Sequence, residues 1–104
     1  MNRDVVRLLE IDGRLEPVFQ CPGCNCLHAV WVNEHNPHTN AIWSWNGDAI
    51  KPTFTPSINV KSNPRIGAVH ICHSFVRDGM IQFLDDCTHA LKGKTVALPT
   101  TDHW

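Results

Sequence analysis

The stretch Cys21-Pro22-Gly23-Cys24 is the point around which we expect the rest of the chain to fold. Two cysteines separated by a Pro-Gly pair form a tight turn, which points both sulfurs the same way and leaves backbone N–H groups free to donate to them. A turn of this kind typically supplies half of a tetrahedral metal site. The pair therefore predicts a metal knuckle whose other ligands come from elsewhere in the chain.

The composition is typical of one small, soluble globular domain. The 104 residues are 42% hydrophobic and 18% charged, and their net charge is −1. The core of a single domain over residues 1–104 is modest, so a bound metal would add stability. There is no basic run and no apolar stretch of membrane-spanning length, so we expect neither a nucleic acid nor a membrane as partner. Because the N-terminus leads into no signal-peptide pattern, we expect a cytoplasmic location.

The chain contains five cysteines and seven histidines. In a reducing cytoplasm these residues indicate metal ligands before disulfides, and an odd number of thiols cannot all pair. Outside the Cys21 and Cys24 pair, a single cysteine can instead be buried as a small hydrophobic residue. Zinc is the preferred metal because tetrahedral sites of mixed sulfur and nitrogen suit it, although iron would also accept four thiolates.

Most of the chain shows the pattern of short strands separated by turns. Asp12-Gly13 favours a two-residue hairpin turn between residues 5–11 and 15–20, although residues 5–11 also fit a short helix. Two prolines make residues 51–57 extended, and residues 99–104 are expected to form a loose tail. Further strands are expected over residues 27–32, 42–45, 58–60 and 95–98.

A second hairpin has a register that can be counted outward from its Asp78-Gly79 turn. The counted pairs are Arg77 with Met80, Val76 with Ile81, and Ser74 with Phe83. Continued pairing would bring His70 opposite Cys87. The strand period of two then places Cys72, His70 and Cys87 on one face of the sheet and His73 on the other.

The segment after this hairpin, residues 85–93, is expected to form a short helix that ends at a glycine. Cys87 in its first turn would meet exposed N–H groups and the positive end of the helix dipole, which both favour a thiolate. His89 follows two residues later and could bind the same metal or support it from outside. The predicted metal ligands are Cys21, Cys24 and Cys72, with one of Cys87, His89 and His73 as the fourth.

Trp43 and Trp45 share one face of a predicted strand. Such a pair of indoles either joins the core or lines a binding groove. Together with Thr55 and Ser57 of the proline-rich segment, the two tryptophans form a candidate binding surface.

Three blocks of the chain resemble a small family of phage and prophage proteins. The blocks are Cys21-Pro22-Gly23-Cys24 with Cys26 and His28, residues 51–58, and Cys72-His73-Ser74-Phe75-Val76 through Asp86-Cys87-Thr88-His89 to Leu98-Pro99. Members are often labelled ammonia monooxygenase, an activity that we do not expect from a small soluble chain without a copper-type histidine cluster. Distant relatives lie beside bacterial ubiquitin-like conjugation genes and are regarded as metal-dependent peptidases. The resemblance thus implies a zinc protein of the bacterial cytoplasm, and from these relatives a peptidase.

Two functions remain open, and each involves a protein as substrate or partner. In a zinc-dependent peptidase, three protein ligands would leave a position for water, with Asp86, Asp85 or Glu34 as general base. In a zinc-stabilised binding module, four ligands would close the site and the metal would only support the fold. For both we expect a mainly β, small antiparallel domain with a zinc knuckle and one short helix.

Overall fold

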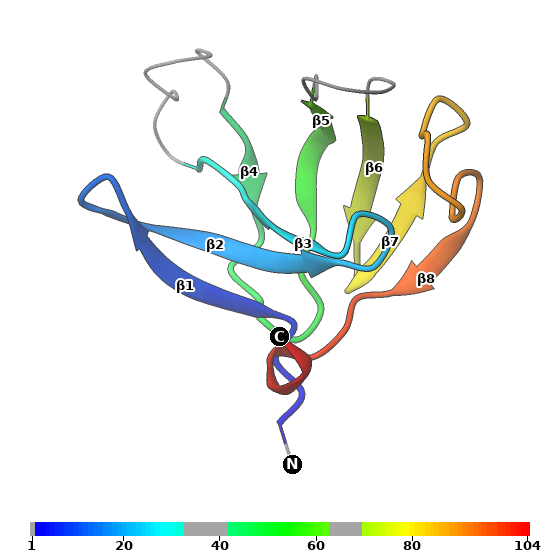
Figure 1. Cartoon of the computed structure of the whole chain (residues 1–104). Coiled ribbons are helices and arrows are strands. Elements are labelled where there is room, and N and C mark those ends of the chain that lie inside the picture. The colour runs from blue at the N-terminus through cyan, green and yellow to red at the C-terminus, as the bar shows by residue number, and fades with distance from the viewer. Residues whose placement is uncertain (1, 33–41, 63–69) are drawn as a thin grey trace.

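The structure is a computed structural model that describes residues 2–32, 42–62 and 70–104. Its strands form a three-stranded sheet of order β1-β2-β3 and a five-stranded sheet of order β4-β5-β6-β7-β8, and the smaller sheet crosses over the larger (Figure 1). All strand pairs within the two sheets are antiparallel. The expected mainly antiparallel β domain is therefore confirmed. The strands are β1 (Val6–Ile11), β2 (Arg14–Cys21), β3 (Cys26–Ala29), β4 (Ser44–Trp45), β5 (Phe54–Ser62), β6 (His70–Arg77), β7 (Met80–Phe83) and β8 (Thr95–Ala97).

Both predicted two-residue hairpin turns are confirmed. Asp12 and Gly13 have φ values of 52° and 80°, and they join β1 to β2 with Ile11 opposite Arg14. Asp78 and Gly79, with φ values of 51° and 77°, join β6 to β7 in the same way. Positive φ at both central positions gives a turn whose twist matches that of the flanking strands. Residues 6–11 are accordingly a strand and not a helix.

The counted register of the β6–β7 hairpin is also confirmed. The pairs Arg77 with Met80, Val76 with Ile81, and Ser74 with Phe83 are all present. One more bond follows this register, from the N–H of Leu84 to the carbonyl of His73, and the chain then turns away. His70 and Cys87 are therefore not a strand pair, as the turn begins before the pairing reaches them.

The core lies between the two sheets and takes side chains from both. Phe19 of β2 and Phe54 of β5 meet there with their ring centroids 6.1 Å apart. Burial of each large apolar side chain contributes roughly 1.5–3 kcal/mol to stability. The most completely buried of the large apolar side chains in this cluster are Phe19, Phe83, Ile81, Val30 and Val76.

The expected short helix over residues 85–93 is not formed, and the structure has a series of turns there. The N–H of Lys92 donates to the carbonyl of His89 in one of these turns, whereas other backbone groups of the segment bond to neighbouring strands. Thr88 donates its N–H to Ile71 of β6, and Gly93 donates its N–H to Phe83 of β7. These bonds hold the connection between β7 and β8 against the sheet. They use backbone N–H groups that a regular α-helix would bond to carbonyls four residues earlier.

The last residues differ from the loose tail expected from the sequence. Thr101–His103 forms a 3₁₀ helix, which is the only helix in the described part of the chain. The N–H of Thr101 donates to the carbonyl of Asp4 at 2.8 Å, and the amide of Asn2 donates to the Thr101 hydroxyl at 2.7 Å. The two ends of the chain are thereby held together (Figure 1). No helix within residues 2–32, 42–62 and 70–104 is long and apolar enough to cross a membrane.

Candidate active site and metal-binding cluster

The side chains of Cys21, Cys24, His28 and Cys72 converge at the inner face of the sheets. One ligand atom from each of the four residues lies within 4.8 Å of the others. Cys21 ends β2, Cys24 lies in the turn before β3, and Cys72 lies in β6. The Sγ atoms of Cys21 and Cys72 are 3.6 Å apart, although the residues are 51 positions apart in sequence. The cluster thus links the two sheets and could hold a metal ion.

The electrostatics of the thiols favour a bound cation. A hydrogen bond from Cys72 lowers the pKa of Cys21 to about 3, and the same contact raises the pKa of Cys72 far above its ordinary value. Burial raises the pKa of Cys24 to about 12. Neighbouring thiolates repel one another, so all three ionise together only when a positive charge compensates them. A divalent metal would supply that charge.

His28 gives independent evidence that the residues fit a metal. Its side chain is buried, and its Nε2 atom has no hydrogen-bond partner. A buried polar nitrogen without a partner is costly, and coordination would satisfy it. Three sulfurs and one imidazole nitrogen make a tetrahedral donor set of a common structural type.

His28 takes the fourth place that we assigned to Cys87, His89 or His73. The β2–β3 hairpin pairs Phe19 with His28 and Cys21 with Cys26, which turns the His28 ring towards the knuckle. The sequence places His28 only four residues after Cys24, and this short spacing was the signal that could have identified it. Cys26 itself is exposed and lies outside the cluster.

Two more histidines adjoin the cluster. His89 packs against Gly23 so closely that a Cβ atom on that glycine would lie 2.3 Å from the imidazole ring. The Nε2 atom of His89 is buried and has no hydrogen-bond partner. The Nε2 atom of His70 lies 3.1 Å from the Sγ atom of Cys24. Neither belongs to the group of four convergent residues.

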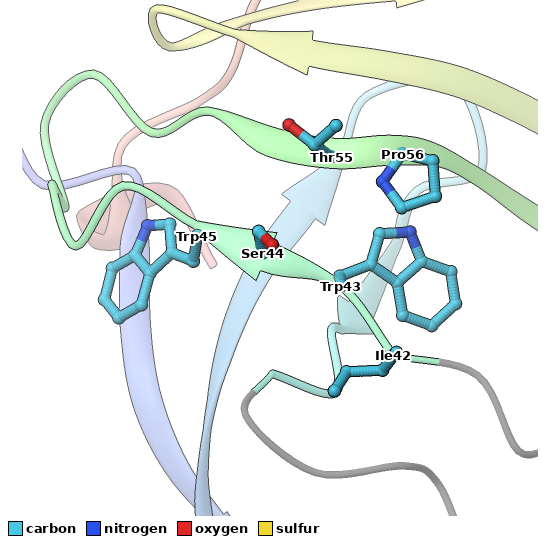
Figure 2. A pocket seen from close by; sticks show the side chains of 6 residues that line it. All are labelled: Ile42, Trp43, Ser44, Trp45, Thr55 and Pro56. Atoms are coloured by element: carbon cyan, nitrogen blue, oxygen red, sulfur yellow. The ribbon is translucent and has the colours of Figure 1, made fainter.

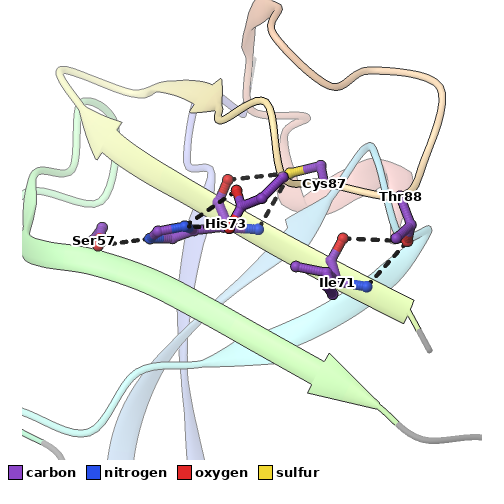
Figure 3. A network of polar contacts seen from close by, with 6 residues as sticks. Ser57, Ile71, His73, Cys87 and Thr88 are labelled. Carbon is purple, nitrogen blue, oxygen red and sulfur yellow. Dashed lines mark hydrogen bonds and ion pairs between the residues drawn. The ribbon is translucent and has the colours of Figure 1, made fainter.

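His73 points to the opposite face of β6 and takes part in a different arrangement. Its Nε2 atom lies 3.0 Å from the hydroxyl of Ser57, and its Nδ1 atom lies 3.1 Å from a carboxylate oxygen of Asp86. The contact to Ser57 is seen in Figure 3. A hydroxyl, an imidazole and a carboxylate joined in this order are the parts of a serine nucleophile with its general base and orienting acid.

The three residues are open to solvent to different degrees. The side chains of His73 and Asp86 are 23% and 53% exposed, and Ser57 is half-buried. The end of the arrangement formed by Asp86 is therefore the most open to solvent. Among the general bases suggested by the sequence, Asp86 contacts His73, Asp85 is exposed, and Glu34 lies outside the described residues.

A bulge in β5 presents Ser57 to the histidine. Phe54 pairs with Val76 and Ile58 pairs with Ser74, so the three residues 55–57 face a single residue of β6. Pro56 has no N–H for the sheet ladder and so suits this position. Bulges of this kind redirect a side chain and occur beside active sites. The sequence shows no nucleophile motif at Ser57, and only the pairing of β5 with β6 brings it to His73.

The Cys87 thiol contacts both the backbone N–H and the backbone carbonyl of His73. The His73 N–H donates to the Cys87 Sγ atom at 3.2 Å, and the Cys87 thiol donates to the His73 carbonyl at 3.2 Å (Figure 3). Cys87 is buried and directly follows Asp86 in the chain. It therefore ties the loop that carries Asp86 to the strand that carries His73.

Three of the four residues of the candidate binding surface line a pocket of about 530 Å³ (Figure 2). Trp43, Trp45 and Thr55 line it, whereas Ser57 faces His73. The indole N–H of Trp43 donates to the backbone carbonyl of Ser57 at 3.2 Å. The complete lining is Ile42, Trp43, Ser44, Trp45, Thr55 and Pro56.

A comparison with protein families gives one result that bears on this arrangement. The model of a family described as "Bacterial ubiquitination-like system serine protease (BubE)" matches residues 2–84. The matched range contains Ser57, His73 and the four residues of the cysteine-histidine cluster, and it ends two residues before Asp86. No curated protein and no solved structure matches the chain significantly.

Proposed function

The chain belongs to the family of bacterial ubiquitination-like system serine proteases (BubE), and on this premise we propose that Ser57, His73 and Asp86 are its catalytic triad. The observation that carries the proposal is the continuous contact from the Ser57 hydroxyl through both nitrogens of His73 to the Asp86 carboxylate, at 3.0 Å and 3.1 Å. A protein is the substrate, as the family description implies.

Each triad member has a defined step. His73 Nε2 takes the proton of the Ser57 hydroxyl while the Oγ atom attacks the carbonyl carbon of the peptide bond. Asp86 accepts a hydrogen bond from Nδ1–H, which fixes the tautomer and stabilises the imidazolium. The imidazolium then protonates the leaving amine, and an ester to Ser57 remains.

The second half of the reaction reverses these roles. His73 removes a proton from water, whose oxygen attacks the ester carbonyl. The imidazolium returns its proton to the Ser57 oxygen, and the carboxylic acid product leaves. The proton count balances, and no group outside the triad and water is consumed.

We further propose that the cysteine-histidine cluster binds zinc and that this zinc is structural. Four protein ligands complete a tetrahedral shell, so no position remains for a hydrolytic water. Cys72 and His73 point to opposite faces of β6, which separates the metal from the triad. A bound zinc would supply folding energy and no catalytic step. Thiolate ligands persist in a reducing environment, so we place the peptidase in the cytoplasm.

A serine-reactive fluorophosphonate probe tests the assignment. We expect it to label the full chain at Ser57, as mapped by mass spectrometry, and we expect Ser57→Ala to lose both labelling and cleavage of a bacterial ubiquitin-like protein with a C-terminal extension. Thr95→Ala is the matched control, because Thr95 carries an exposed hydroxyl in β8, the opposite edge strand of the same sheet. Full activity of Ser57→Ala would overturn the proposal, and cleavage that requires free zinc in the assay would point to a metal mechanism instead.

A further inference from the structure

We propose that the pocket between β4 and β5 is a substrate subsite, which binds an apolar side chain of the polypeptide next to the bond that is cleaved. This inference rests on the proposed role of Ser57 as nucleophile. Nothing in the family match assigns the pocket a ligand.

The pocket lies directly beside the proposed nucleophile, Ser57. β4, β5 and β6 are consecutive neighbours in one sheet, with the pocket on β4 and β5, the serine on β5 and the histidine on β6. Pro56 lines the pocket and directly precedes Ser57, and the Trp43 indole bonds to the Ser57 carbonyl. A side chain in this pocket therefore belongs to a residue close to the attacked carbonyl group.

The walls of the pocket are held in place before any substrate binds. The Trp43 indole is fixed by its bond to Ser57, and the Trp45 ring stacks on Phe54 of the core with centroids 6.1 Å apart and an interplanar angle of 19°. The Trp45 indole N–H also donates to the backbone carbonyl of Asp48. Walls that are already ordered lose little conformational entropy on binding.

The chemistry of the lining selects the kind of side chain. Ile42, Trp43, Trp45 and Pro56 are apolar, and none of the described lining residues carries a charge. Ser44 and Thr55 are exposed and lie opposite each other across the β4–β5 ladder, where their hydroxyls can bond to a polypeptide backbone. A volume of about 530 Å³ holds one large side chain with part of its backbone. An apolar residue of an extended polypeptide fits these features best.

Internally quenched peptides that differ at one position test the subsite. The full chain is assayed with a series of peptides that carry Leu, Asp or Lys at each position around the cleaved bond. We expect one position at which the peptide with Leu is cleaved much faster than those with Asp or Lys. Ser44→Asp places a carboxylate at the exposed rim of the pocket. We expect it to lower kcat/KM for the Leu peptide by about tenfold or more and to raise the relative rate with Lys at that position.

Labelling by the fluorophosphonate probe separates this inference from the proposed function. In Ser44→Asp the probe should still label Ser57, because Ser57, His73 and Asp86 are all present. Thr95→Asp is the matched control, as Thr95 is exposed in the opposite edge strand, β8. Trp43→Phe, which keeps an aromatic ring, should also weaken the Leu preference. Unchanged specificity in both pocket variants with normal labelling would overturn the subsite alone, whereas absent labelling of the wild type would overturn both proposals.

Discussion

Cys72 and His73 are consecutive residues of β6 whose side chains serve two different sites. The Cys72 Sγ atom lies 3.6 Å from that of Cys21 in the metal-binding cluster, and the His73 Nε2 atom lies 3.0 Å from the Ser57 hydroxyl on the other face. The alternation of side chains along a strand permits this arrangement. Any ion that holds Cys72 would therefore also fix the backbone of His73, the proposed general base.

We expect Cys72→Ser to lose the bound metal and most of the folded population, because the cluster links the two sheets. Metal content by mass spectrometry and thermal unfolding by circular dichroism measure the two effects. Cys26→Ser is the matched control, since Cys26 belongs to the same hairpin but is exposed and lies outside the cluster. Equal metal content in the Cys72 variant and the wild type would contradict the shared site.

The adjacent residues Asp85 and Asp86 allow a strict test of the triad. Asp86→Asn keeps the shape of the side chain but removes the charge that orients His73, so kcat should fall by about 10²- to 10⁴-fold. Asp85→Asn should keep the wild-type kcat, because Asp85 is exposed and Asp86 is the residue that contacts the histidine. Steady-state kinetics on a peptide substrate distinguish the variants. If both variants lost a similar share of kcat, the negative charge of this turn, and not the contact between Asp86 and His73, would support catalysis.

Cys87 should act as a positioning residue through its two bonds to the His73 backbone. Cys87→Ala removes both bonds, so kcat should fall several-fold while KM stays close to that of the wild type. Cys87→Ser keeps a donor and an acceptor at the same place and should restore most of the rate. If Cys87→Ala lowered only the unfolding temperature, the residue would be structural and the positioning role would be wrong.

Local turn chemistry made one part of the fold predictable. Asp12-Gly13 and Asp78-Gly79 specify two-residue turns with positive φ, and a fixed turn fixes the register of both hairpins. Cys21, Cys24 and Cys72 were also predictable as members of one cluster, because the spacing of the first two is typical of half a metal site and Cys72 lies in the hairpin whose register can be counted.

The contacts of His73 with Ser57 and Asp86 were not predictable in the same way. Ser57 meets His73 only through the pairing of β5 with β6, and that register contains a bulge which no sequence pattern specifies. The expected helix after β7 was wrong because strand neighbours take up the backbone groups that a helix would use. Contacts between segments, and not local propensity, decide both features.

Gly23 should tolerate no side chain, for steric reasons that involve His89. A Cβ atom at position 23 would lie 2.3 Å from the His89 ring, so Gly23→Ala must displace either the knuckle or the histidine. We expect a loss of about 1–3 kcal/mol in the free energy of unfolding. His89→Ala opens the space, so the double variant should lose less than the sum of the two single variants. Denaturant unfolding of all four proteins gives the coupling free energy. Additive losses would show that the glycine is required by the metal knuckle itself and not by the histidine that covers it.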